Sequence, residues 1–237
     1  MWSGPRFMST ALLRSWESRA DTATADEPFY GYFLAATGAD RPGRDDALAS
    51  MPQQWSEVVR WLEGPIPDGK AIWYQKHHSL HLVGEMPWQW ISGMTNCFLI
   101  RDPRLVIKSY SRIRPEFTAD DLGYKQLVEV FDFVRSTAIT PIVVDASDLR
   151  RSPGPQLETL CAAVGVPFDP AMLRWAPGRR SSDPPLGDPW YQNVQQTTGF
   201  AGTDDPVPAV PRQYWKVLEL CTNHYDYLSM YRLGATR

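Results

Sequence analysis

The segment SGPRFMST, residues 3–10, combines a cation with adjacent hydroxyl groups at the start of an apolar helical pattern. Gly4 and Pro5, which favour a turn, come directly before Arg6, and Ser9 and Thr10 precede Ala-Leu-Leu. A helix N-terminus presents free backbone N–H groups and the positive end of the helix dipole. Arg6 adds a full charge, and the two hydroxyl groups can cap the helix and donate to anionic oxygens. This order of residues predicts an anion site.

The loop departs from the nucleotide-binding pattern GxxxxGK[ST]. Arg6 is not followed directly by a hydroxyl residue, and Met8 stands where a glycine is expected. A site for a metal–triphosphate is therefore disfavoured. The simpler alternative is that Ser9 only caps a helix and that the loop binds nothing.

A second cation lies where a buried strand is expected to end. The apolar run 97–100 is followed by Arg101, and Pro103 opens a helix that carries Ser109 two turns further on. In an open α/β sheet, ligands bind beyond the carboxyl ends of the strands, and an arginine fork matches phosphate. Arg101 and Ser109 thus predict a second anion site. The alternative is a local ion pair between Arg101 and Asp102.

Metal-binding patterns are weak in this chain. Three of the four histidines, His77, His78 and His81, fall within five positions. This clustering is compatible with a zinc site, but no acidic or thiol residue lies nearby in the sequence at ligand spacing. The three cysteines are widely separated and form no CxxC pair. We therefore expect no metal ion, and we interpret the cysteines as small apolar residues in a reducing compartment.

Strand and helix patterns alternate along the chain and predict an α/β fold with a central parallel sheet flanked by helices. The Pro- and Gly-rich segment 178–211 is expected to form an irregular functional or mobile loop. Strands are predicted at 1–2, 72–75, 97–100 and 141–145, and helices over 9–19, from Pro103, over 121–136, over 154–165 and from 211.

Length and composition limit the classes of function. A chain of 237 residues fits one domain, 1–237, and a net charge of −3 argues against a broad nucleic-acid surface. The sequence shows no leader pattern and no apolar stretch long enough to span a membrane, so we expect a cytoplasmic protein. It carries no signal for an oligomeric state.

Five segments resemble the bacterial sulfotransferase family, most closely its short members whose first loop reads Ser-Gly-Pro-Arg. They are WSGPRFMSTALLRSW, DEPFYGYFL, QKHH, FLIRDPRLVIKSYSR and WYQNVQQTTGF. The resemblance spans nearly the whole chain, and the Arg-Asp-Pro-Arg segment with its later serine is the most specific part. It implies a three-layer P-loop sulfotransferase-like fold.

The resemblance also implies the donor 3′-phosphoadenosine 5′-phosphosulfate (PAPS), the product 3′-phosphoadenosine 5′-phosphate (PAP), and no metal. By this resemblance the opening loop binds the 5′-phosphosulfate, and the 3′-phosphate is bound elsewhere. The implied donor-binding residues are Arg6, Phe7, Met8, Ser9 and Thr10 for the phosphosulfate, and Arg101 and Ser109 for the 3′-phosphate, with Arg179 and Arg180 as weaker matches to a late basic segment.

The implied reaction is in-line transfer of a sulfuryl group to a hydroxyl or amine of a small-molecule acceptor. Arg6 and Lys76 are the cations that would stabilise the leaving phosphate. Three residues are candidates for the base that removes the acceptor's proton: His77, His78 and Glu27 in DEPF. On an extended strand, His78 shares a face with Lys76. Ten tryptophans and ten tyrosines, Trp190 and Tyr191 among them, suit an aromatic or apolar acceptor, and segments 31–68 and 183–205 are the candidate lids.

Two other functions stay open at this point. A P-loop nucleotide kinase would need an acidic residue after a strand to hold magnesium, and Asp145 after PIVV is a candidate. A non-catalytic anion-binding or nucleotide-binding protein of the same fold would keep the two anion sites and lose the reaction.

Overall fold

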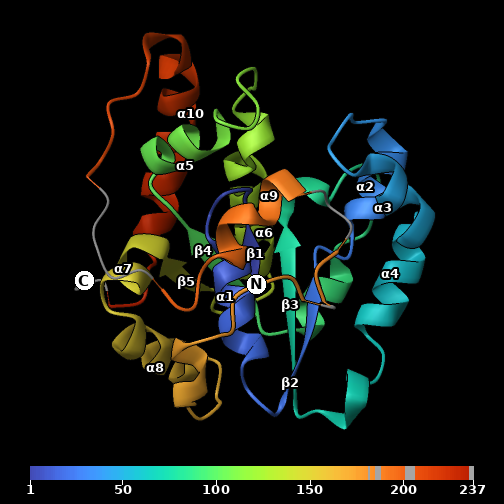
Figure 1. Ribbon diagram of the computed structural model, residues 1–237. Coiled ribbons are helices and arrows are strands. Elements are labelled where there is room, and N and C mark those ends of the chain that lie inside the picture. Colours follow the sequence, from blue (N-terminus) through green and yellow to red (C-terminus); the bar gives the residue numbers. More distant parts are fainter. Residues whose placement is uncertain (181, 185–187, 201–205, 235–237) are drawn as a thin grey trace.

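A computed structural model describes residues 1–180, 182–184, 188–200 and 206–234 of the chain. Its centre is a five-stranded, fully parallel sheet with the order β2-β3-β1-β4-β5 (Figure 1). The strands are β1 (Trp2–Ser3), β2 (Thr22–Asp26), β3 (Ile72–His78), β4 (Cys97–Ile100) and β5 (Ile142–Asp145).

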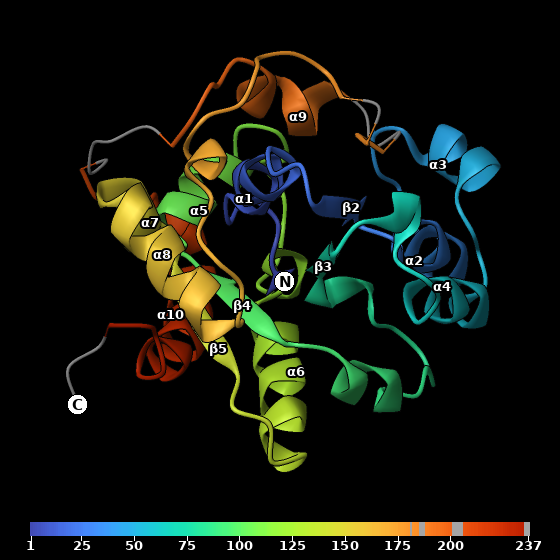
Figure 2. The same cartoon turned by 90° about the horizontal axis from the view of Figure 1, so that it is seen from below.

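Helices cover both faces of this sheet, which gives three layers. In Figure 2, α1 and α8 lie on one side of β4 and β5, and α6 lies on the other. The helices are α1 (Ser9–Glu17), α2 (Tyr30–Thr37), α3 (Arg44–Ser50), α4 (Trp55–Leu62), α5 (Pro103–Tyr110), α6 (Tyr124–Ser136), α7 (Ala146–Arg151), α8 (Pro153–Ala163), α9 (Asp188–Gln195) and α10 (Trp215–Ser229). None of these described helices combines the length and apolar character that crossing a membrane requires.

The central strands are the most buried part of the sheet. All four residues of β4 are buried, because helices pack on both of its faces. The Phe98 ring meets the Phe131 ring of α6 edge-on, with centroids 5.3 Å apart. This rigid centre fixes the positions of the loops that follow each strand.

The strand register brings polar residues to one edge of the sheet. Asp26 at the end of β2 pairs with Lys76 of β3, and Ser3 at the end of β1 pairs with His78. Ile100 at the end of β4 pairs with Asp145 of β5, so the carboxyl ends of all five strands lie on the same edge. Helix α9 lies beyond this edge, next to the end of β3 (Figure 1).

The predicted α/β fold is confirmed, and so are the predicted strands and the predicted helices, which correspond to α1, α5, α6, α8 and α10. The sequence does not predict α7, which directly follows β5. The sequence reading missed β2 and the helices α2, α3 and α4 that connect β2 to β3. The expectation of an irregular segment over 178–211 is wrong at α9, and parts of that segment lie outside the described residues.

Candidate active site

A cavity of about 550 Å³ opens at the carboxyl edge of the sheet. Its walls come from the opening loop, the N-terminal turn of α1, the ends of β2, β3 and β4, helix α5 and helix α9. The sequence-predicted residues that line it are Arg6, Met8, Ser9, Thr10, Glu27, His78, Arg101, Ser109, Trp190 and Tyr191. Segments separated by up to 185 positions thus build one site.

The opening loop has a strained backbone. Arg6 and Met8 adopt left-handed conformations, with φ of 68° and 70°, and so does Glu27 with φ of 49°. Such conformations are uncommon for residues other than glycine, and they cluster at functional sites. Gly4 is required for a different reason, since a Cβ atom there would lie 2.3 Å from the carbonyl oxygen of Leu122. Arg6, Met8 and Glu27, the three residues with positive φ, all line the cavity.

Helix α1 points an uncapped N-terminus at the cavity. Ser9 and Thr10 are its first two residues, and Met8 is its N-cap, with no hydrogen bond from that side chain to the described helix. The expectation that Ser9 or Thr10 caps the helix is therefore wrong, because both residues already lie inside it. Their hydroxyl groups and the first backbone N–H groups of α1 are left to face the cavity, an arrangement suited to an anion.

Arg6 and the second predicted anion site adjoin each other. Arg6 donates from Nε to the hydroxyl of Ser109 (2.9 Å) and from Nη1 to the carbonyl oxygen of Trp190 (3.0 Å). Arg101 donates to the carbonyl oxygen of Arg6 (2.7 Å), and its own carbonyl oxygen accepts from Tyr124 (2.6 Å). Burial lowers the pKa of Arg6. Its partners among the described residues are neutral oxygens, so its charge is available to an anion.

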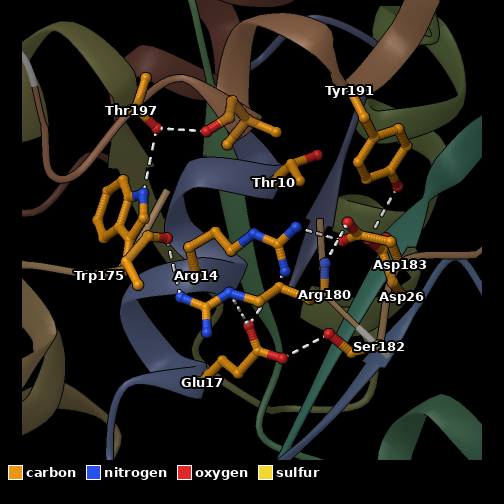
Figure 3. Close-up of polar contacts among 12 residues, drawn as sticks. Thr10, Arg14, Glu17, Asp26, Trp175, Arg180, Ser182, Asp183, Tyr191 and Thr197 are labelled. Carbon is orange, nitrogen blue, oxygen red and sulfur yellow. Dashed lines mark hydrogen bonds and ion pairs between the residues drawn. The ribbon is translucent and has the colours of Figure 1, made fainter. Parts of the chain in front are cut away.

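Lys76 is the centre of a buried charge cluster. It is 1% exposed, and its Nζ donates to Asp26 (2.6 Å), Glu27 (2.8 Å) and the hydroxyl of Thr10 (3.1 Å). Tyr191 of α9 closes the cluster by donating to Asp26 (2.8 Å), as Figure 3 shows. Two carboxylates therefore surround one ammonium group, and a hydroxyl connects it to the N-terminus of α1.

The pKa values in this cluster follow from burial and charge. Burial raises the pKa of Asp26 to about 6, although Lys76 opposes this shift. Burial acts to lower the pKa of Lys76, but the two carboxylates outweigh it and the net shift is upward. Lys76 is therefore a permanent cation at neutral pH.

His77 and His78 point to opposite sides because β3 alternates its side chains between two faces. His77 is stacked on Trp2, with ring centroids 4.5 Å apart, and does not line the cavity. His78 faces the cavity, and its Nδ1 lies 3.4 Å from Glu27 Oε2. Burial, aided by the charge of Lys76, lowers the pKa of His78 well below its usual value, so the ring is neutral.

The late basic residues lie outside the cavity in this structure. Arg180 interacts with Glu17 at 3.9 Å, and its backbone N–H donates to Asp183 (2.9 Å). The Arg14 guanidinium, buried on α1, binds both Glu17 and Asp183 (Figure 3). These contacts tie Arg180 and Asp183 to α1. Arg179 is exposed.

Asp145 has a structural role. Its side chain caps α7 by accepting from the Ser147 N–H (2.7 Å), and it also accepts from the Tyr225 hydroxyl (2.7 Å). It is buried, burial raises its pKa, and it does not line the cavity. This placement does not favour a magnesium site for a nucleotide kinase.

The sequence reading missed several residues of the site. Asp26 was missed together with β2, whose sequence TATAD is a short strand signal that ends in an acid. His81 was noted only within the histidine cluster. The cavity walls also contain residues that sequence reasoning did not single out, namely Tyr30, Phe33, Arg41, Leu80, Lys108, Tyr110 and Arg112.

The chain is similar to known proteins in both sequence and fold. The chain is 34% and 32% identical over 228 residues to the branched-chain-amino-acid aminotransferase-like proteins 1 and 2 of Arabidopsis thaliana. Those alignments cover 96% of this chain but 39% and 40% of the relatives, so the chain spans about two-fifths of their length.

The sulfotransferase domain from the Synechococcus PCC 7002 olefin synthase has a similar fold, with a TM-score of 0.51 at 15% identity, covering 93% of this chain and 92% of that one. The family model for the sulfotransferase domain matches residues 1–228. The strained loop, the uncapped helix and the cationic cavity are thus features of a chain that belongs to the sulfotransferase domain family.

Proposed function

We propose that this chain transfers a sulfuryl group from PAPS to a hydroxyl or amine of a small-molecule acceptor. One observation carries this proposal: the cavity lined by the N-terminal turn of α1 and by Arg6 is also lined by Glu27 and His78, and Lys76, buried behind this wall, donates to both Thr10 and Glu27. An anion site and a candidate base thus line the same cavity.

The residues present fit a doubly anionic donor. The 5′-phosphosulfate would lie against the backbone N–H groups of the loop that includes Phe7, with Ser9 and Thr10 as hydroxyl donors. Arg101 and Ser109 would bind the 3′-phosphate. The Ser109 hydroxyl accepts from Arg6 (2.9 Å) and can still donate its own hydrogen to the phosphate.

Arg6 and Lys76 would stabilise the charge that develops on the leaving phosphate. PAPS supplies the activated sulfuryl group, whose transfer leaves negative charge on the bridging oxygen. Preorganised cations aimed at such developing charge stabilise the transition state more than the ground state. Lys76 is already held toward the loop by its bond to Thr10 (3.1 Å).

His78 is the base that we propose, and Glu27 is its positioning residue. With Glu27 accepting from Nδ1–H, the Nε2 lone pair of His78 can take the proton of the acceptor, and the carboxylate stabilises the imidazolium that forms. The Nδ1–Oε2 distance of 3.4 Å is at the long end of hydrogen bonding. His77 is not proposed, since it packs on Trp2 away from the cavity.

The acceptor would be aromatic or apolar apart from its reacting group. Tyr30, Phe33, Leu80 and Trp190 supply apolar wall to the cavity. We also propose that residues 1–237 act as one domain, because residues between Pro5 and Phe200 line one cavity at the edge of a single sheet.

Turnover of PAPS to PAP with a panel of phenols and amines tests this function. We expect His78→Gln to lower kcat by about 10²–10⁴-fold, the usual contribution of a general base, with little change in PAP affinity. Glu129→Gln, an exposed change on α6, is the matched control. A His78→Gln enzyme with unchanged kcat, beside an inactive Glu27→Gln enzyme, would show that Glu27 itself is the base.

A further inference from the structure

Glu27, His78 and His81 form a compact group of ligand atoms at the wall of the cavity. One oxygen or nitrogen atom from each residue lies within 4.8 Å of the others, and all three residues line the cavity. Glu27 follows β2, His78 ends β3, and His81 lies in the short 3₁₀ turn Ser79–His81 that comes next. The sulfuryl transfer proposed above leaves His81 without a role.

The spacing of the three residues suits a tetrahedral metal ion. Zinc bound at about 2.0–2.1 Å by nitrogen and oxygen sets neighbouring ligand atoms about 3.4 Å apart. His78 Nδ1 and Glu27 Oε2 are already separated by 3.4 Å. The His81 ring lies beside that of His78, with centroids 5.3 Å apart, and one of its nitrogens lies within 4.8 Å of the ligand atoms of Glu27 and His78, so it can supply a third ligand.

His81 is a buried imidazole that packs against the rings of Tyr30, Phe33 and His78. It is 3% exposed, and its Nδ1 atom makes no hydrogen bond to any described residue. A buried polar atom without a partner costs about 1–3 kcal/mol, so a native structure usually has a reason for one. Burial lowers the pKa of His81 to about 3, which keeps the ring neutral, as a metal ligand must be.

Local charge favours a cation here although the rest of the cavity is cationic. Lys76 is opposed by two carboxylates, Asp26 and Glu27, which leaves one unbalanced negative charge. Arg41, another cation of the cavity wall, is neutralised by an ion pair with Asp121 (2.8 Å).

We propose that Glu27, His78 and His81 form a binding site for Zn²⁺, with the fourth coordination position open to the cavity. A His₂Glu set with one open position is a known zinc arrangement, and the imidazoles favour zinc over magnesium. Zinc at this site occupies both His78 and Glu27, so it inhibits sulfuryl transfer. The inhibition rests on the proposed function, whereas zinc binding does not.

Calorimetric titration of tag-free protein with ZnCl₂, without PAPS, tests the site. We expect one zinc ion per chain, and Co²⁺ should give the visible absorption of a tetrahedral complex. Because losing even an outer-sphere partner of a metal ligand costs about 10–100-fold in affinity, His81→Gln should weaken zinc binding by more than about 100-fold. His224→Gln, a histidine change on α10, should leave it unchanged.

Zinc binding that survives His81→Gln, or that is lost in His224→Gln, would overturn the proposal. Equal binding of MgCl₂ would also overturn it, since it would indicate a carboxylate site only. Should His81→Gln unfold, His78→Gln serves instead, because the His78 side chain is 11% exposed and tolerates change better. A chain that binds zinc but never turns over PAPS would refute the proposed function and leave the zinc site standing.

Discussion

Replacing Lys76 by methionine tests the buried charge cluster. The substitution keeps the length of the side chain but leaves Asp26 and Glu27, 8% and 5% exposed, without their shared cation. Removing one partner from a buried ion pair costs about 3–5 kcal/mol, because the remaining charge is uncompensated. We expect the free energy of unfolding in urea at pH 7.5 to fall by this amount.

The pH dependence of this loss follows from Asp26. Its folded pKa, about 6 in the wild type, is raised above the usual value of 3.8, so the folded state binds the proton more tightly than the unfolded state. Protonation therefore stabilises the fold as pH falls. Without Lys76 the pKa of Asp26 rises further, so the variant gains up to about 1.4 kcal/mol for each pH unit by which the pH falls toward 6, whereas the wild type gains only about 0.4 kcal/mol between pH 7.5 and pH 6.

The difference in unfolding free energy between variant and wild type should therefore narrow by up to about 1.5 kcal/mol between pH 7.5 and pH 6. Lys125→Met is the control, because Lys125 is 61% exposed and only 3.9 Å from Glu129, and it should change stability by less than about 0.5 kcal/mol. A Lys76→Met loss as small as that of the control, with no pH dependence, would refute the buried cluster.

Two further substitutions test how α9 and the opening loop are held. Tyr191→Phe removes one of the two buried donors to Asp26, the other being Lys76, and should cost about 1–3 kcal/mol in urea unfolding, and a loss below about 0.5 kcal/mol would contradict the contact. Gly4→Ala would place a Cβ atom 2.3 Å from the Leu122 carbonyl oxygen and should cost about 1–3 kcal/mol, whereas Gly93→Ala, with open space around it, should not. Equal effects of the two glycine substitutions would contradict the packing of the loop.

The sheet centre was predictable because its signals are local. The apolar run of β4, closed by Arg101 and Pro103, marks both the strand and the helix after it. The cluster around Lys76 was not predictable in the same way, because it depends on the register between β2 and β3, which are about 50 residues apart. The short strand β2 contains only threonine, alanine and aspartate, and so gives no hydrophobic pattern.

The choice between His77 and His78 as the base also could not be made from the sequence. Strand alternation predicted that Lys76 and His78 share a face, but it did not say which face of β3 meets the cavity. His77 turns to the other face and packs on Trp2 from β1, a contact across 75 positions. Helix α9 has eight residues and lies within a Pro- and Gly-rich segment. The composition of that segment predicts an irregular loop, so the helix was missed.

Calorimetric titration with PAP in the absence of metal tests the central claim most directly. We predict micromolar binding to the wild type and much weaker binding of AMP, because AMP lacks the 3′-phosphate. Binding should be lost in Arg101→Ala and retained in Arg104→Ala, whose side chain is 47% exposed and pairs with Asp102. No binding of PAP, with binding of ATP–magnesium instead, would contradict the sulfotransferase account and favour a nucleotide kinase.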